Sequence, residues 1–262
     1  MDAILALEGY RWDLSLLALA AVLLVPKLLA PLFRLLPPFR EVARLNRERE
    51  QKQWAKSYYK PVQKRSAFWG MATQLAIFAL IIPFVITAEP QPWWRVVRDM
   101  VLILMVYDFF YYLTHRFLFH DGGFGPGPLV WVHSVHHQQK DPCRRDASYL
   151  HPIEVSMGLG LYGLTIGLLG ALLGDFHLVT IVVTWLAFSE INLINHDLMP
   201  ADKFNRFPWN YLKYASHMHH VHHSSFASGN YATISLLYDW LFGTYDRGDG
   251  WGKNRRAQPK NA

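Results

Sequence analysis

Five apolar stretches alternate with polar connections along the chain. Each has about the 20 residues that a helix needs to cross the hydrocarbon core of a bilayer. The last two are joined only through Gly174, Asp175 and Phe176, so we expect a tight helical hairpin that either crosses fully or enters the membrane and returns. The five stretches cover residues 14–36, 66–88, 96–119, 153–174 and 177–195. This pattern predicts an all-α integral membrane bundle with four to five membrane helices.

The distribution of basic residues predicts the orientation of these helices. The connection between the first two stretches carries Arg40, Arg44, Arg47, Arg49, Lys52, Lys56, Lys60, Lys64 and Arg65. By the positive-inside rule this connection is cytoplasmic. Counting crossings from there places residues 120–152 and the C-terminal region on the same side, and residues 89–95 and 174–176 on the other. The first stretch has no small-residue cleavage site after it, so we interpret it as an anchor and not as a signal peptide.

Composition supports a membrane protein. Of the 262 residues, 52% are hydrophobic and only 18% are charged, which is too apolar for an ordinary soluble domain. The formal charge of +6 arises largely from residues beside the apolar stretches. Such basic segments favour anionic lipid headgroups, so we expect membrane lipids and no nucleic acid as partners. The single cysteine, Cys143, excludes an intrachain disulfide and a thiolate metal cluster.

The thirteen histidines are concentrated in three clusters. On a helix, positions i, i+3 and i+4 lie within about 100° of one face, so each H-x-x-H-H pattern predicts three imidazoles on one side. The first cluster is an i, i+5 pair, which shares a face only if the helix ends or is distorted there; Gly122 and Gly123 follow it. The clusters are His115 and His120; His133, His136 and His137; and His219, His222 and His223.

A ninth candidate ligand, His196, ends the fifth apolar stretch four residues after Asn192. All nine histidines fall on the predicted cytoplasmic side. A catalytic zinc ion uses about three protein ligands and a structural zinc ion four, so nine indicate two metal ions with four or five nitrogens each. Imidazole suits iron, copper, nickel and zinc. Zinc has no redox chemistry, and a membrane enzyme meets unreactive hydrocarbon, so we favour iron.

The remaining histidines are not expected to be ligands. His151 and His177 are isolated, and His217 and His220 lie off the face that the third cluster shares. Four polar residues are candidates for orienting the ligands from outside. Asp108 precedes His115 by two helical turns and could accept its ring N–H; a packing hydrogen bond to a tyrosine is the alternative. The other three candidates are Asn192, Glu154 and Asp197.

These residues form an ordered set of motifs. They are Asp108-Phe-Phe-Tyr-Tyr followed by His115-Arg116 and His120, Trp131-Val-His-Ser-Val-His-His137, His151-Pro-Ile-Glu154, His219-His-Val-His-His-Ser224, Asn230-Tyr231, and Asp239-Trp-Leu-Phe-Gly-Thr-Tyr245. The set resembles the fatty acid hydroxylase/sterol desaturase superfamily over more than half of the chain, and is most similar to bacterial sterol-desaturase-like members. Ala232 and Trp240 depart from the usual Gly and Arg, which bears on the subfamily and not on the ligands.

The resemblance implies a non-haem di-iron oxidoreductase that uses O2 as co-substrate to hydroxylate or desaturate a lipid such as a sterol or fatty acyl chain. It implies two iron ions, although overexpressed protein could carry zinc. Electrons would come from a separate ferredoxin- or cytochrome-type protein. We expect an integral protein of a bacterial inner membrane with the histidine site on the cytoplasmic side. Residues 1–262 would form a single membrane domain, with anchor helices and a basic loop (1–100), a histidine-box core (101–247) and a polar tail (248–262).

Three other functions remain open at this stage. A metal transport or storage protein would place histidines along the spans. A haem or quinone protein would place isolated histidines in the middle of the bilayer, where H-x-x-H-H motifs are not expected. A hydrolytic zinc enzyme could use the same clusters, and activity that survives strict anaerobiosis would identify it.

Overall fold

The computed structural model describes residues 9–248, and these form nine α-helices joined by short turns. The π-helix η2 (His115–Phe119) directly follows α4, the 3-10 helices are η1 (Ile82–Phe84), η3 (His136–Gln138) and η4 (Arg144–Ser148), and the strands are β1 (Ile86–Thr87) and β2 (Phe176–His177). The α-helices are α1 (Trp12–Phe33), α2 (Pro37–Trp54), α3 (Tyr59–Leu80), α4 (Trp93–Thr114), α5 (Val130–His133), α6 (Pro152–Leu173), α7 (Leu178–Asn195), α8 (Trp209–Ser224) and α9 (Leu237–Leu241). Of the predicted polar tail, all but Gly248 lies outside the described residues.

Four helical segments of the described chain are long and apolar enough to cross a membrane: α1, Tyr59–Phe84, α6 and α7. They confirm four of the five predicted stretches and the helical membrane bundle. The remaining stretch, residues 96–119, is α-helical up to Thr114 and continues as the π-helix η2, but it does not qualify as a membrane span. Charged side chains interrupt its apolar sequence, including Asp99 and Asp108, which are both 0% exposed. The helix α4 is therefore more polar than the prediction assumed.

The core of the bundle is aromatic and closely packed. Tyr162 of α6 stacks on Phe188 of α7 with ring centroids 4.3 Å apart, and Tyr107 of α4 meets Phe188 edge-on at 5.1 Å. Glycines let α3 approach α6: a Cβ atom at Gly163 would lie 2.8 Å from the side chain of Ile77. Small residues at a contact between membrane helices allow such close approach of the backbones.

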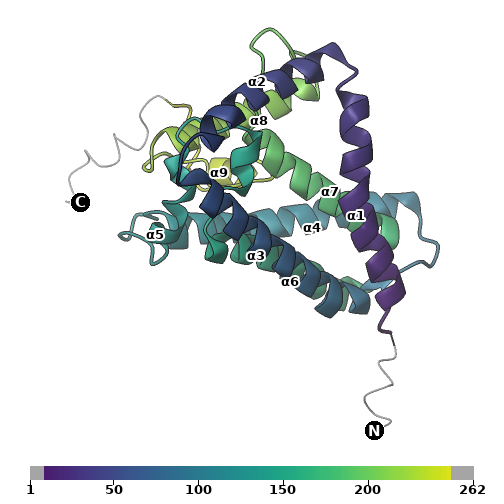
Figure 1. Ribbon diagram of the computed structural model, residues 1–262. Coiled ribbons are helices and arrows are strands. Elements are labelled where there is room, and N and C mark those ends of the chain that lie inside the picture. The colour runs from purple at the N-terminus through teal and green to yellow at the C-terminus, as the bar shows by residue number, and fades with distance from the viewer. Residues whose placement is uncertain (1–8, 249–262) are drawn as a thin grey trace.

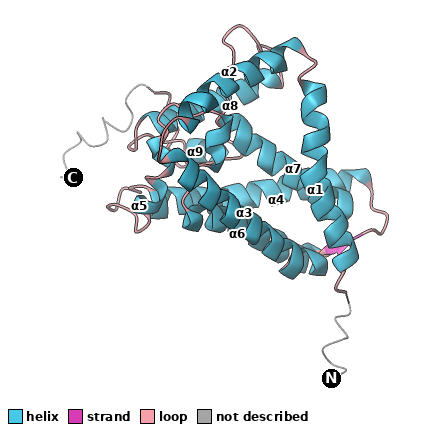
Figure 2. Cartoon of the chain, in the orientation of Figure 1, coloured by secondary structure: helices cyan, strands magenta, loops and turns pink. Residues whose placement is uncertain are grey.

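The connections between helices gather at two opposite ends of the bundle (Figure 1). At one end β1 and β2 pair in parallel beside the start of α1, as Figure 2 shows, and the backbone N–H of Arg11 donates to Pro83. At the other end α2 lies against the histidine-bearing segments: the Oδ1 atom of Asn46 accepts the backbone N–H groups of Arg144 and Leu198. The basic connection that contains α2 and the histidine-bearing connections, which the charge distribution predicts to lie on one side of the membrane, therefore lie at the same end of the bundle.

Candidate metal centre

The first histidine pair depends on the π-helix at the end of α4. Residues 115–119 form one turn with i→i+5 bonding in place of the α-helical pattern. A π-turn brings residues five apart onto one face, so His115 and His120 point to the same side. The distortion that the i, i+5 spacing required is therefore present.

The second cluster differs from its prediction. We expected one helix carrying three imidazoles on one face, but α5 ends at His133 and a separate 3-10 turn begins at His136. This break sends neighbouring histidines in different directions: His133 and His137 join one group and His136 joins another. The third cluster lies on the single helix α8 as predicted, and it too contributes to both groups.

Among the described residues, the nine predicted histidines converge in two groups whose candidate ligand atoms lie within 4.8 Å of one another. All nine side chains are at most 9% exposed. Each group draws on distant parts of the chain, so the tertiary fold assembles it. The first group is His115, His120, His133, His137 and His222, and the second is His136, His196, His219 and His223.

Hydrogen bonds from the Nδ1 atoms orient most of the rings. Seven of the nine Nδ1 atoms face an acceptor oxygen, which is a carboxylate for His133 and a backbone carbonyl for the others. Only a protonated Nδ1 can donate to such an oxygen, so in these neutral rings Nε2 carries the lone pair. The carbonyl acceptors are those of Tyr231, Phe226, Tyr149, Asn192, Gly229 and Gln139.

The Nε2 atoms then face one another at close range. Those of His115 and His133 are 2.9 Å apart, and those of His136 and His196 are 3.2 Å apart. Because Nδ1 holds the proton in all four rings, each contact sets two lone pairs against each other, which is unfavourable without a cation between them. Two nitrogens at right angles around a metal ion with bonds of about 2.1 Å would be about 3 Å apart. The donor set therefore fits two metal ions.

Burial supports this reading. Removal from water lowers the pKa of all nine imidazoles, and the neighbouring histidines add to the effect for most of them. The pKa values of His136 and His222 fall to about 4. The rings are therefore neutral near pH 7, which is the form that binds metal ions. The Nε2 atom of His120 is buried and has no hydrogen-bond partner in the described part of the chain.

Of the four residues predicted to orient the ligands, Glu154 contacts a candidate ligand through its side chain. Its Oε1 accepts the Nδ1–H of His133 at 2.7 Å, with both side chains at most 2% exposed. Glu154 lies in the first turn of α6, which places its carboxylate under the short helix α5. A carboxylate at this position raises the basicity of the ring and fixes its tautomer.

Asp108 has a different role from the one predicted. No hydrogen bond within residues 9–248 joins it to a histidine or to a tyrosine. Its carboxylate accepts the backbone N–H groups of Thr233, Ile234 and Ser235 at 2.8–3.1 Å, together with the Ser235 hydroxyl. The spacing of two helical turns does place Asp108 and His115 on one side of the helix. The backbone of residues 233–235, however, packs against this side and donates the hydrogen bonds that the Asp108 carboxylate accepts.

Asn192 and Asp197 also do not orient a ring through their side chains. The backbone carbonyl of Asn192 accepts the Nδ1–H of His196 at 2.8 Å, while its side-chain oxygen accepts the Thr233 hydroxyl. Asp197 pairs with Arg144 at 2.9 Å, and burial raises the pKa of Asp197 to about 6. Of these two residues, Asn192 contacts the ring of His196, and it does so through its backbone carbonyl and not through its side chain.

The histidines that we set aside lie outside both groups. His151 and His177 immediately precede α6 and α7 and cap them: each Nδ1 accepts the backbone N–H two residues later, from Ile153 and Val179. His217 and His220 lie on α8 but belong to neither group.

Sequence reasoning missed the loop that supplies three of the carbonyl acceptors, at Phe226, Gly229 and Tyr231. Asp239 holds this loop by accepting the N–H groups of Tyr231 and Ala232 at 2.8 Å, and burial raises the pKa of Asp239 to about 6. Gly229 is in such close contact that an added Cβ would lie 1.8 Å from the carbonyl oxygen of Thr244. Asp239 was part of a quoted motif; a carbonyl acceptor has no residue-type signal.

Comparison with known proteins places this centre in a family. Residues 100–244 match the model of the fatty acid hydroxylase family. The chain is 32% identical over 167 residues to methylsterol monooxygenase erg25B of Aspergillus fumigatus, covering 60% of this chain and 51% of that protein. It is 33% identical over 167 residues to the very-long-chain aldehyde decarbonylase GL1-8 of Oryza sativa (59% and 55%), and 29% identical over 178 residues to methylsterol monooxygenase 2-1 of Arabidopsis thaliana (61% and 60%).

The chain spans about half the length of the curated relatives it matches. No solved structure matches it significantly. The family match covers more than half of the chain and includes all nine histidines of the two groups. This protein is therefore a member of the fatty acid hydroxylase family, within the fatty acid hydroxylase/sterol desaturase superfamily.

Proposed function

We propose that the two histidine groups bind a non-haem di-iron centre, and that the protein is an O2-dependent oxidoreductase that hydroxylates or desaturates a membrane lipid. The observation that carries this proposal is the set of Nε2 atoms that face one another at about 3 Å while their Nδ1 atoms are engaged elsewhere. A pair of redox metal ions accounts for this arrangement, and the membrane bundle accounts for a lipid substrate.

The chain's own residues would divide the work between the two groups. Five imidazoles would hold one iron ion and four the other. When bound, such a centre would supply the oxidising power needed to remove hydrogen from an unactivated C–H bond. The backbone carbonyls hold each ring in the tautomer that ligates, and Glu154 would offset the positive charge that neutral imidazoles leave uncompensated.

The family and the membrane setting support the substrate class and the partners that we propose. The relatives' names refer to methylsterols and very-long-chain aldehydes, so a sterol or a long acyl chain is the substrate class that we propose. A separate ferredoxin- or cytochrome-type protein would deliver electrons. We further propose that residues 1–100 anchor the protein, that residues 101–247 form the catalytic core, and that the centre faces the cytoplasm beneath a bacterial inner membrane.

The decisive experiment combines metal analysis with lipid analysis. Purified protein should contain about two iron ions per chain, and cells that express it should gain a lipid heavier by one oxygen or lighter by two hydrogens. Replacing His136 or His222 by Ala should abolish this product and lower the iron content. The control is His217→Ala, which replaces an exposed histidine on α8, the helix that also carries His222. Full turnover by an iron-free preparation would disprove the proposal.

The alternatives make different predictions. A zinc hydrolase would keep its activity under strict anaerobiosis, whereas an oxygenase would lose it. In the described chain the nine histidines gather at one end of the bundle, which does not favour a transporter with ligands along the spans. An absorption spectrum without haem bands would exclude a haem protein.

A further inference from the structure

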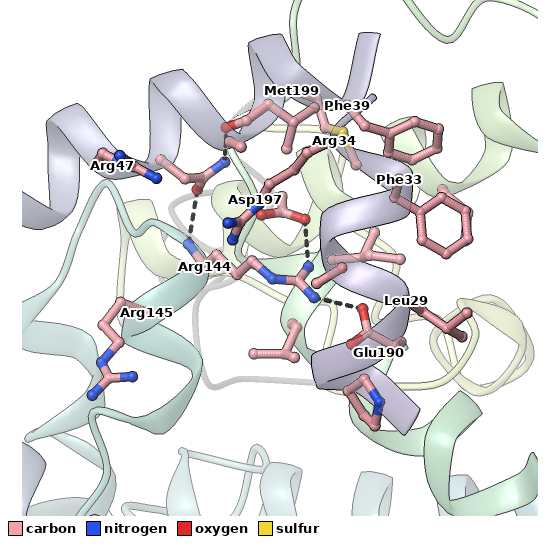
Figure 3. Close-up of a pocket in the computed structure, with 18 of the residues that line it drawn as sticks. Leu29, Phe33, Arg34, Phe39, Arg47, Arg144, Arg145, Glu190, Asp197 and Met199 are labelled. Atoms are coloured by element: carbon pink, nitrogen blue, oxygen red, sulfur yellow. Dashed lines mark hydrogen bonds and ion pairs between the residues drawn. The ribbon is translucent and has the colours of Figure 1, made fainter. Parts of the chain in front are cut away.

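A second site lies on the flank of the bundle, away from the histidines. A pocket of about 620 Å³ opens where the second half of α1 diverges from α7, and α2 closes it from above (Figure 3). Figure 1 shows the same arrangement as a triangle whose sides are α1, α2 and α7. None of the nine candidate ligands lines this pocket, so a molecule bound there would not use the metal centre for its recognition.

One wall of the pocket is apolar and belongs to membrane-spanning helices. Leu29 and Phe33 come from the end of α1, and Leu186 and Leu193 from α7. These side chains lie within the spans, so the wall faces the hydrocarbon region of the bilayer. Leu29 and Phe33 are 42% and 46% exposed in the isolated chain, which leaves them available to an alkyl chain.

The opposite rim is basic and belongs to elements beyond the spans. Arg34 follows the last residue of α1, Arg47 is on α2, and Arg144 and Arg145 are on η4. As Figure 3 shows, Arg144 is engaged by Glu190 and Asp197, at 2.5 and 2.9 Å. The nearest carboxylate oxygen to Arg145 is 3.9 Å away, on Glu50.

Arg34 and Arg47 are the arginines that remain for a ligand. Within residues 9–248, no carboxylate forms an ion pair with either of them, and both are exposed. Two uncompensated guanidinium groups beside an apolar wall match a molecule with an anionic head and a hydrocarbon tail. Arginine forms two parallel hydrogen bonds to phosphate, which adds strength and direction to the charge attraction.

We propose that this pocket binds an anionic phospholipid, with its phosphate against Arg34 and Arg47 and an acyl chain between α1 and α7. The two features coincide in depth: the apolar wall ends where the spans end, and the arginines begin there. Basic pockets between membrane helices at this boundary are suited to anionic headgroups. This site is separate from the proposed oxygenase chemistry and does not depend on it.

The test is lipid binding by the full-length chain in detergent, followed by native mass spectrometry. Phosphatidylglycerol should bind more tightly than phosphatidylcholine with the same acyl chains, and glycerol 3-phosphate should bind far more weakly than either. Replacing Arg34 and Arg47 together by Gln should weaken phosphatidylglycerol binding by about 25-fold, since each basic residue contributes about fivefold. Lys52→Gln, an exposed cation on α2 that does not line the pocket, should leave binding unchanged.

A second variant tests the cavity without changing its charge. Ala43 lines the pocket, and Ala43→Trp should fill it and weaken phosphatidylglycerol binding, with the iron content retained. Equal binding of the two phospholipids, or no effect of the double arginine variant, would overturn the headgroup assignment. Binding of glycerol 3-phosphate as tight as that of the lipid would show a phosphate site without a lipid and would also refute the proposal.

Discussion

Within residues 9–248, Glu154 is the carboxylate that directly hydrogen-bonds one of the nine candidate ligands, and this gives the charge at that position a specific test. Glu154→Gln keeps an acceptor oxygen for His133 but removes the negative charge, so we expect both iron ions to stay while turnover falls about tenfold. Glu154→Leu removes the acceptor as well and should lower metal affinity by 10- to 100-fold. Iron content and product formation measure the two effects.

The matched control for that position is Glu48→Gln, an exposed carboxylate on α2 paired with Arg44. It should change neither iron content nor turnover, because surface ion pairs contribute little. If Glu154→Leu retained both iron ions with unchanged affinity, the carboxylate would have only a packing role.

Gly229 also has a strict steric requirement. A methyl group there would overlap the carbonyl oxygen of Thr244, and the carbonyl of Gly229 accepts the Nδ1–H of His222 at 2.8 Å. Gly229→Ala should therefore destabilise the protein by about 1–3 kcal/mol, as overpacking does, and should lower the iron content of the group that contains His222. Thermal unfolding and metal analysis report the two consequences.

Gly160→Ala is the comparison, because a Cβ at Gly160 of α6 meets nothing within 4 Å. It should leave the melting temperature unchanged or slightly higher, since alanine favours a helix over glycine. Equal melting temperatures for the two variants would contradict the close contact at Gly229.

At the scale of the element, the histidine motifs do not correspond one to one with the two groups of candidate ligands. The motif around α5 and the motif on α8 both contribute to the two groups, because the break after His133 and the spacing on α8 separate neighbouring rings. If the groups bind metal ions, the loss of a histidine should therefore affect the ion of its group and not an ion assigned to its sequence motif.

A pair of single variants tests this division. His120 belongs only to the first group and His196 only to the second. His120→Ala and His196→Ala should each lower the iron content from about two ions to about one, and turnover should be lost in both. His220→Ala, outside both groups, should keep two. Loss of both ions from each variant would show that the groups bind metal as a single unit.

At the scale of the whole molecule, the orientation that we propose places the two ends of the bundle on opposite sides of the membrane. Exposed Glu89 lies beside β1 at the strand end, where its backbone N–H donates to the Thr87 hydroxyl, and exposed Lys52 lies in the last turn of α2, the helix that packs against the histidine-bearing segments. An impermeant maleimide added to intact cells should label Glu89→Cys but not Lys52→Cys, and permeabilised cells should show both. The native Cys143 is 0% exposed and should not react. The reverse labelling pattern would place the centre on the outer side.

Several features of this protein were accessible from the sequence because they depend on residue type and spacing. Hydropathy and charge determined the apolar helices and which connections share an end. Imidazoles are rare enough that their clustering identified the nine candidate ligands, and the i, i+5 pair required the helix distortion that η2 provides. The stretch 96–119 was overestimated as a membrane span, because its length outweighed the buried carboxyl groups of Asp99 and Asp108 within it.

Only the tertiary structure decided how these residues are shared and held. The division into groups of five and four depends on where α5 breaks, a matter of backbone geometry that the motif does not encode. Most of the rings are oriented by backbone carbonyls, which every residue possesses, so no pattern of side chains marks them in advance. Asp108 does not contact its predicted partner, His115, because sequence spacing decides only which residues share a helical face. Which contacts they make depends on the distant segment that packs against that face, here residues 233–235.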